Sequence, residues 1–162
     1  KSEWIEWIIL DLRGNGWWLM PVAVEIVSHF VPKWQLIVSA KYKWYTDEKY
    51  YSRWFGEFEW IKTVVLIDWM TASAGEIIAT ALQEQAGAKL LGTNTFGKGT
   101  IQTLDEFSDW DSLKYTIWKR FPASDKNIDN IWIKPDITVE FDMESYLENN
   151  VDNQLEEAKS LF

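Results

Sequence analysis

The sequence of 162 residues contains no cysteine and a single histidine, His29. Without cysteine there is no thiol nucleophile, no cysteine-ligated zinc ion and no disulfide framework. A lone histidine leaves one choice of base for any Ser-His-Asp triad, and a metal site would be built mostly from carboxylates. Because His29 lies beside Phe30 in an expected helix, we interpret it as a packed or capping residue.

Positive charge and long apolar runs are also in short supply. The chain has 16 Lys and Arg against 25 Asp and Glu, a formal net charge of −9, which argues against a nucleic-acid partner. No stretch approaches the roughly 20 apolar residues of a membrane span, and no signal peptide is recognisable. Because the chain starts at Lys1 without Met, we expect a fragment of a longer protein.

Apolar runs and amphipathic segments alternate along the chain, and polar or glycine-rich stretches separate them. This pattern predicts a single α/β layered domain over residues 1–162. Expected strands cover residues 4–12, 35–40, 63–68, 89–91, 100–104 and 113–119, and expected helices cover residues 22–31, 73–85 and 152–161. The remaining long segments are expected to be a solvated hairpin (41–59), a glycine-rich loop (92–99) and a polar loop (122–130).

The glycine-rich loop Gly92–Gly99 (GTNTFGKG) nearly matches a phosphate-binding P-loop. That motif needs Ser or Thr after its Lys to hold magnesium, and a helix whose N-terminus faces the phosphates. Here Gly99 follows Lys98, and residues 100–104 alternate like a strand. We therefore interpret the loop as a glycine-rich turn rather than a nucleotide site, and ATP binding would revive the nucleotide hypothesis.

A second constellation stands at the start of an expected helix, in Thr71–Glu76 (TASAGE). A serine there can act as a nucleophile, because N–H groups at the helix end can hold a developing oxyanion. The spacing Ser73-x-x-Glu76 is also that of a capping box, in which the serine caps the helix and the glutamate reaches back. Taken alone, the segment favours the cap over the nucleophile.

With one histidine and no cysteine, a serine nucleophile needs another base. A lysine can serve if burial keeps it neutral at the working pH. Lys98 lies between two glycines, where the backbone can pass close to another element. Gln102 follows four residues later, and on a strand it would share a face with Lys98. Its amide could then orient the lysine amine.

In this order and at this spacing, the motifs resemble those of the C-terminal processing peptidases, or tail-specific proteases, a family of Ser-Lys serine peptidases. The resemblance runs from Asp11 to about Leu161. The interval of 25 residues from Ser73 to Lys98 is that of the family. The matching segments are Asp11–Asn15 (DLRGN), Thr71–Ile77 (TASAGEI), Thr95–Gly99 (TFGKG) with Gln102, and Ile133–Asp136 (IKPD).

The resemblance implies a role for each of these residues. Ser73 would be the nucleophile, Lys98 the general base and Gln102 its orienting residue, with an acyl-enzyme intermediate. The oxyanion donors would be the Ala74 N–H and an N–H of the turn that is here Gly16-Trp17-Trp18. The implied fold is a crotonase- or Clp-protease-like α/β spiral of ββα units, here an incomplete protease core. No cofactor or metal is implied.

The family also implies partners and a compartment. Substrates would be proteins or peptides recognised by their C-terminal tails. An upstream PDZ domain is expected in the full-length protein, although no PDZ segment lies in these residues. The expected location is extracytoplasmic, in the periplasm or at the cell envelope. The alternative is a catalytically inactive homologue of the same fold that binds peptides or apolar ligands.

Tryptophan, with 12 residues, outnumbers glycine, with 8, which reverses ordinary usage. Tryptophan is strained in turns that need positive φ, and at positions 17 and 18 it would crowd the oxyanion site. Six tryptophans fall where the family pattern usually has glycine or a glycine turn: Trp17, Trp18, Trp34, Trp44, Trp110 and Trp132.

Three explanations of the tryptophans compete. They could form a surface that binds apolar or sugar ligands, or they could mark an inactive homologue. Alternatively, UGA codons that encode glycine in the natural gene have been translated as tryptophan. We favour this third hypothesis, because it explains the excess of tryptophan, the shortage of glycine and the positions together. It predicts UGA rather than UGG at these codons.

Overall fold

The computed structural model describes residues 5–16, 19–42, 46–97, 100–106, 112–122 and 132–162. One of its two sheets, sheet A, contains β1 (Trp7–Asp11), β4 (Lys62–Ile67), β5 (Lys89–Gly92) and β8 (Ile137–Thr138). The strand order is β1-β4-β5-β8, and every neighbouring pair is parallel. Parallel strands are usually covered on both faces, which explains the nearly continuous apolar runs of β1 and β4.

The second sheet, sheet B, is antiparallel and has the order β3-β2-β7-β6. It consists of β2 (Leu36–Tyr42), β3 (Glu48–Tyr51), β6 (Thr100–Glu106) and β7 (Ser112–Pro122). The hairpin expected within residues 41–59 is wrong in its bounds: β3 lies in this range, but it pairs with residues 36–40 of β2, so the hairpin begins in the preceding strand. The strand β6 follows the glycine-rich loop where a P-loop would need a helix, which argues further against a nucleotide site.

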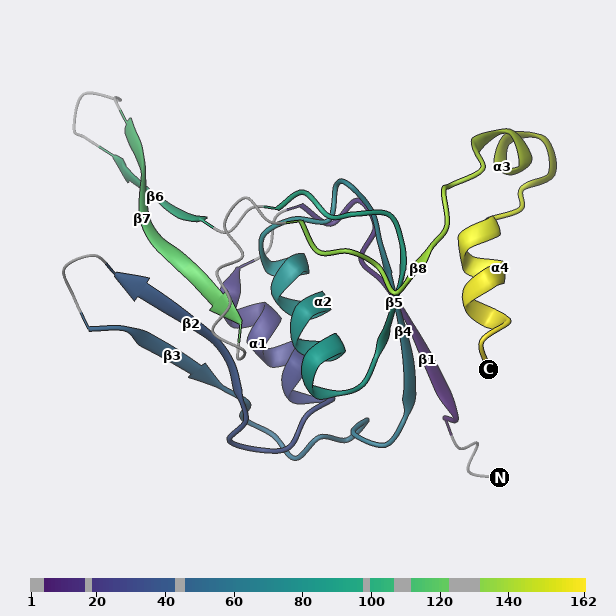
Figure 1. Cartoon of the computed structure of the whole chain (residues 1–162). Helices are drawn as coiled ribbons and strands as arrows, with labels where there is room; N and C mark the ends of the chain where they lie inside the picture. The colour runs from purple at the N-terminus through teal and green to yellow at the C-terminus, as the bar shows by residue number, and fades with distance from the viewer. Residues whose placement is uncertain (1–4, 17–18, 43–45, 98–99, 107–111, 123–131) are drawn as a thin grey trace.

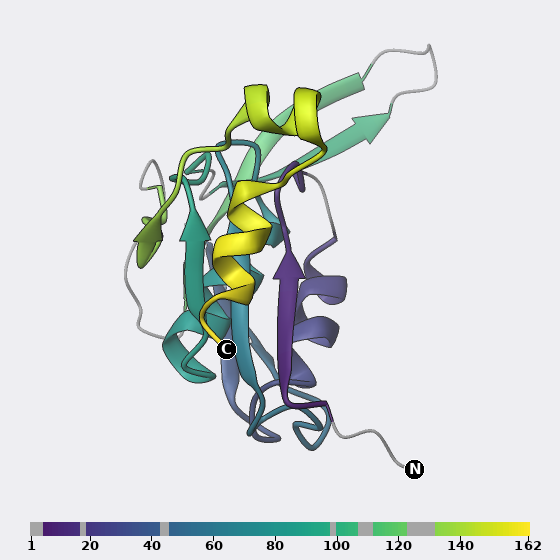
Figure 2. The same ribbon diagram turned by 90° about the vertical axis from the view of Figure 1, so that its right-hand side faces the viewer.

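The elements form layers (Figure 1). The helices α1 (Met20–Ser28) and α2 (Ala74–Gln85) lie between the two sheets. The C-terminal helices are α3 (Met143–Asn149) and α4 (Asn153–Lys159), and Figure 2 shows α4 crossing the opposite face of sheet A. No helix in the described part of the chain has the length and apolar character to cross a membrane.

Two apolar clusters hold these layers together. The larger one joins α1 and α2 to sheet A and to β2, with Val27, Ile78 and Leu90 fully buried in it. The smaller one lies under α4, where Ala158 packs against Leu66 and Leu91 of sheet A. At about 25 cal/mol per Å² of apolar surface removed from water, such burial is the dominant favourable contribution to folding.

The predicted α/β class is confirmed, and the expected helix and strand segments correspond to elements of the structure within a few residues. Two elements were missed. The strand β8 has only two residues, and α3 has no buried residue, so neither carries a hydrophobic period. Most of the expected polar loop, residues 123–130, lies outside the described residues.

The tryptophans lie on the surface. Every tryptophan whose side chain the structure describes is at least 45% exposed, whereas tryptophan is on average a highly buried residue. Trp34 also has φ of +69°, in the left-handed region that favours glycine. Its side chain is 74% exposed, so no burial compensates for this backbone strain. Both observations support the hypothesis of glycine codons translated as tryptophan.

Candidate active site

Three loops that carry the sequence motifs meet at one edge of sheet A. They follow β1, β4 and β5, and they comprise residues 12–16, 68–73 and 93–97. Because these strands are parallel, their carboxyl ends lie at the same edge, which is where α/β sheets commonly place their sites. The sheet topology thus brings the DLRGN and TASAGE segments together with residues 95–97 of the TFGKG segment.

Asp68 ties the first two loops to each other. Its carboxylate accepts hydrogen bonds from the N–H of Gly14 (3.0 and 3.1 Å) and of Met70 (3.0 Å). It also accepts from the N–H of Thr71 (2.9 Å), and the hydroxyl of Thr71 lies 2.9 Å from the Leu12 carbonyl oxygen. A single carboxylate therefore fixes the nucleophile loop against the turn after β1.

Ser73, the predicted nucleophile, stands immediately before α2 with φ +58° and ψ −117°. An ordinary N-cap residue is extended, and an L-residue held in such a sparsely populated region costs of order 1–3 kcal/mol. A strained serine on a sharp strand-to-helix turn is also the arrangement of the nucleophile elbow. The backbone of Ser73 therefore favours the nucleophile over a simple helix cap, although the Glu76 carboxylate of the capping box does accept the Ser73 N–H.

The start of α2 provides a possible oxyanion site. Ala74 is the first residue of α2, where N–H groups have no carbonyl one turn earlier and the helix dipole favours negative charge. The turn after β1 packs closely here, because the Ala72 N–H donates to the Asn15 carbonyl oxygen at 3.0 Å. A Cβ on Gly75 would lie 3.0 Å from that same oxygen, so a larger residue here would push the turn after β1 away by a few tenths of an ångström.

Not all of the predicted site residues can be placed. Lys98 and the turn residues Trp17 and Trp18 lie outside the described residues. Gln102 lies in β6, which starts at Thr100, and the pairing of β6 with β7 shifts register just before it. The shared strand face of Lys98 and Gln102 therefore stays a prediction.

The loop that leads into Lys98 is nevertheless fixed against the nucleophile turn. The Phe96 N–H donates to the Thr71 carbonyl oxygen at 3.0 Å. The Gly97 N–H and the Thr95 hydroxyl both donate to Oε1 of Glu76 at 2.7 Å. Glu76 is only 2% exposed. Sequence analysis treated Glu76 only as a capping residue and missed this link, which depends on a contact across 19 to 21 residues.

The late IKPD segment has a structural role here. The Asp136 carboxylate accepts from the Leu90 N–H at 2.8 Å and from the Gln83 side-chain amide at 3.2 Å. Two hydrogen bonds join Ile133 to Thr95. The Thr95 N–H donates to the Ile133 carbonyl oxygen, and the Ile133 N–H donates to the Thr95 hydroxyl oxygen. The segment therefore supports β5 and the loop that follows it.

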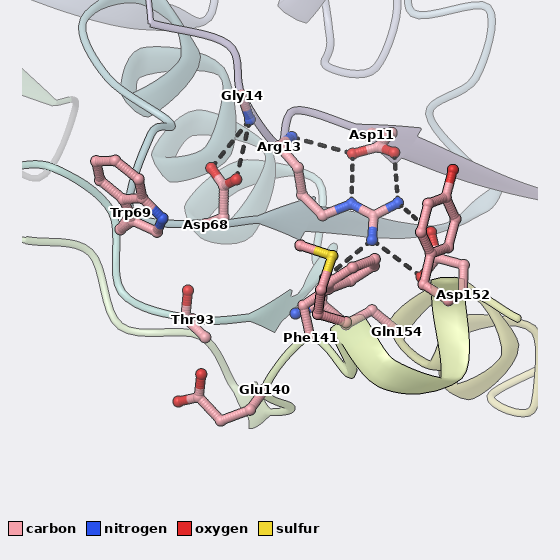
Figure 3. Close-up of a pocket in the computed structure, with 12 residues that line it drawn as sticks. Asp11, Arg13, Gly14, Asp68, Trp69, Thr93, Glu140, Phe141, Asp152 and Gln154 are labelled. Atoms are coloured by element: carbon pink, nitrogen blue, oxygen red, sulfur yellow. Dashed lines mark hydrogen bonds and ion pairs between the residues drawn. The ribbon is translucent and has the colours of Figure 1, made fainter. Parts of the chain in front are cut away.

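Arg13 forms a second cluster beside the site (Figure 3). Its guanidinium makes paired hydrogen bonds to the carboxylates of Asp11 (2.9 and 2.7 Å) and Asp152 (3.0 and 2.7 Å), and one to Gln154 Oε1 (2.9 Å). The bonds to the two carboxylates, chiefly the bond to Asp11, raise the pKa of Arg13 above its usual value. The bond from Arg13 likewise lowers the pKa of Asp152. The cluster fastens α4 to the end of β1.

A pocket of about 610 Å³ lies between this cluster and Asp68 (Figure 3). Ser73 and Ala74 do not line it, so the pocket lies beside the predicted nucleophile rather than around it. Within the described ranges, no group of three His, Cys, Asp or Glu side chains could hold a metal ion. The lining residues come from the end of β1, from the loops after β1, β4 and β5, and from residues 140–154: Asp11, Arg13, Gly14, Asp68, Trp69, Thr93, Glu140, Phe141, Met143, Tyr146, Asp152 and Gln154.

Known proteins share this arrangement. The model of peptidase family S41 matches residues 1–139. The carboxy-terminal processing protease CtpA of Bacillus subtilis (strain 168) is 40% identical over 133 residues, which are 82% of this chain and 28% of CtpA. The solved structure of the photosystem II D1 C-terminal processing protease matches with a TM-score of 0.74 at 28% identity, covering 83% of this chain and 35% of that protein. The tricorn protease shares the fold, with a TM-score of 0.60 at 18% identity over 96% of this chain and 15% of its own.

The fold and the motif-bearing edge define the core of a serine-type peptidase. The chain belongs to peptidase family S41, and the relatives that it matches include a carboxy-terminal processing protease. This confirms the family and the fold class predicted from the sequence. The chain spans 28% of the length of CtpA, and α3 and α4 lie beyond the part that the family model matches.

Proposed function

We propose that the complete protein is a Ser-Lys endopeptidase and that residues 1–162 form its single, partial catalytic core. The observation that carries the proposal is the strained Ser73 at the head of α2, tied through Glu76 to the loop that enters Lys98. A backbone outside the usual regions persists only where the surroundings fix it, and such strain concentrates at functional sites.

The proposed reaction proceeds through an acyl-enzyme. Ser73 Oγ attacks a peptide carbonyl while Lys98 Nζ takes its proton, and the ammonium then protonates the leaving amine. The Ala74 N–H, with an N–H of the Gly16–Trp18 turn, stabilises the oxyanion. Gln102 orients the lysine amine. Water, activated by the same lysine, then hydrolyses the ester and regenerates Ser73.

We extend the proposal to substrates and location on the basis of the relatives. CtpA is a carboxy-terminal processing protease, and the D1 protease is also named for C-terminal processing. We therefore propose protein or peptide substrates that are recognised by their C-terminal tails, an upstream PDZ domain that assists recognition, and an extracytoplasmic location.

Cleavage of a tailed substrate by the complete protein tests this function. The substrate carries an apolar C-terminal tail with a free carboxylate, and a matched substrate lacks the tail. We expect Ser73→Ala and Lys98→Ala each to lower cleavage at least 10³-fold, as removal of a nucleophile or base does elsewhere. Lys89→Ala, which removes an exposed lysine from β5, is the matched control and should retain activity.

Three results would contradict the proposal. Cleavage that survives in Ser73→Ala or Lys98→Ala would refute the assigned roles. Equal cleavage of both substrates would refute tail recognition. Peptide binding without any cleavage by the wild-type protein would instead support the inactive homologue that the tryptophans at 17 and 18 suggest.

A further inference from the structure

A buried threonine links three segments of the site. Thr95 is 4% exposed and lies in the loop after β5. Its hydroxyl donates to Oε1 of Glu76 at 2.7 Å and accepts from the Ile133 N–H at 2.8 Å. Oε1 of Glu76 accepts the Gly97 N–H as well, at 2.7 Å, so two groups of the loop after β5 bind the same carboxylate oxygen.

The second oxygen of Glu76 reaches the nucleophile. Oε2 accepts the Ser73 N–H at 3.0 Å, so one buried carboxylate holds the nucleophile turn and the loop after β5 together. Hydrogen bonds to a charged acceptor in a low-dielectric interior are about twice as strong as neutral ones. The position of the Gly97 N–H is thereby set relative to the Ser73 N–H through one carboxylate, and Gly97 is the residue that precedes Lys98 in the sequence.

We propose that Thr95 and Glu76 form a positioning pair that places the base loop against the nucleophile. The hydrogen bonds of the Thr95 hydroxyl go to Glu76 and Ile133 rather than to Ser73, so we assign it as a positioning residue and not as a catalytic one. The inference rests on the proposed Ser-Lys function, because it gives the pair the task of setting the separation between Ser73 and Lys98. Geometry matters at this level, since small misplacements of reacting groups have large effects on rate.

Three variants of the complete protein test the pair. Thr95→Val keeps the shape of the side chain but removes its hydroxyl. Glu76 then loses a hydrogen-bond donor and the Ile133 N–H loses its acceptor, whereas Thr95→Ser keeps both bonds. Thr80→Val is the matched control, because Thr80 is 6% exposed in α2 and its hydroxyl has no hydrogen-bond partner among the described residues.

The kinetic readout separates positioning from simple stability. We expect kcat to fall 10- to 100-fold in Thr95→Val with KM within threefold, and both to stay within threefold in Thr95→Ser and Thr80→Val. The rise of kcat/KM with pH should move to higher pH in Thr95→Val, because a lysine that is less well held gains solvation, which favours its charged form. A purely structural role would lower the amount of folded protein without moving this pH profile.

Hydrogen exchange gives a readout that needs no activity. We expect the Gly97 amide to be protected in the wild type and to exchange at least tenfold faster in Thr95→Val, with no change in Thr80→Val. Unchanged exchange together with unchanged kcat and pH profile in Thr95→Val would overturn the pair. If Thr95→Val does not fold, an unprotected Gly97 amide in the wild type would overturn it. A wild type that protects Gly97 but cleaves nothing would refute the proposed function and leave the pair standing.

Discussion

Two carboxylates, Glu76 and Asp152, each connect distant segments, but they do so in different surroundings. Glu76 is buried at the start of α2 and accepts from backbone N–H groups and a hydroxyl of the loops that carry the site. The Asp152 side chain is 19% exposed and pairs with the Arg13 guanidinium. Glu76 lies within the family match, and Asp152 lies in the C-terminal segment beyond it.

This difference suggests separate roles for the two hydrogen-bond networks. The Glu76 network should determine kcat, and the Arg13–Asp152 network should determine the stability of the fold. Glu76 holds together loops whose relative position sets the reaction geometry, so its effects should be seen in kcat. Arg13 and Asp152 hold α4 on sheet A, and within the described part of the chain their side-chain bonds reach neither Ser73 nor Glu76, so we expect their effects in the free energy of unfolding. The predictions that follow test this division.

The largest expected effect comes from crowding the nucleophile turn. In Gly75→Ala the new Cβ would meet the Asn15 carbonyl oxygen at 3.0 Å and Thr71 Cγ2 at 3.1 Å, so the turn after β1 must move. We expect kcat to fall at least tenfold, measured as cleavage per folded molecule. Gly56→Ala is the control, because its Cβ would be more crowded still, 2.8 Å from the Val31 carbonyl oxygen, but lies away from the site. Equal losses of kcat in both variants would contradict the division.

An intermediate effect is expected from the Arg13 cluster. Asp152→Asn should lower the free energy of unfolding at neutral pH by about 1–3 kcal/mol, because it removes a charge-assisted pair, with kcat unchanged. Denaturant titration measures the first and cleavage the second. The control is Glu156→Gln, which removes an exposed pair with Lys159 and should cost about 0.5 kcal/mol or less.

The same variant has a pH signature. The pKa of Asp152 is lowered in the folded protein, chiefly by the bond from Arg13. Its stabilisation is therefore present above the unfolded pKa of about 3.9 and is lost as the pH falls through the lower folded pKa. The difference in unfolding free energy between the wild type and Asp152→Asn should shrink over this acidic window. A difference that grows on acidification would contradict the assignment.

The smallest expected effect concerns Trp34. Because its φ is +69°, Trp34→Gly should stabilise the protein by about 1 kcal/mol, the order of cost of a left-handed L-residue. Trp60→Gly is the control: Trp60 is 89% exposed and is not among the positive-φ residues of the described ranges, so it should gain nothing. A loss of stability in Trp34→Gly would contradict the strain.

Sequencing the codons of the gene tests directly whether these tryptophans stand at glycine codons. The glycine-codon hypothesis expects UGA at Trp34 and at the turn residues Trp17 and Trp18. If the codons are UGA, the natural oxyanion turn contains glycines and the peptidase proposal is strengthened. If they are UGG, the tryptophans are genuine, and an inactive or ligand-binding relative is favoured.

How much the sequence revealed depended on the range of the interaction. The runs that became β1 and β4 and the helix that became α2 carry a clear hydrophobic pattern, and short motifs identified the family and Ser73. The role of Arg13 could not be predicted, because its partner Asp152 is 139 residues away and leaves no periodic signal. The double link of Glu76 was hidden for the same reason, since the capping box already explained the residue locally.

The most direct test of the account is to trap the acyl-enzyme. The complete protein is mixed with a tailed substrate and quenched in acid within the first turnover, and its peptides are measured by mass spectrometry. The account predicts an ester-linked acyl group on the peptide that contains Ser73, absent in Ser73→Ala and accumulating more slowly in Thr95→Val than in Thr80→Val. Cleavage by the wild type with no acyl group on Ser73, or with one on another residue, would contradict it.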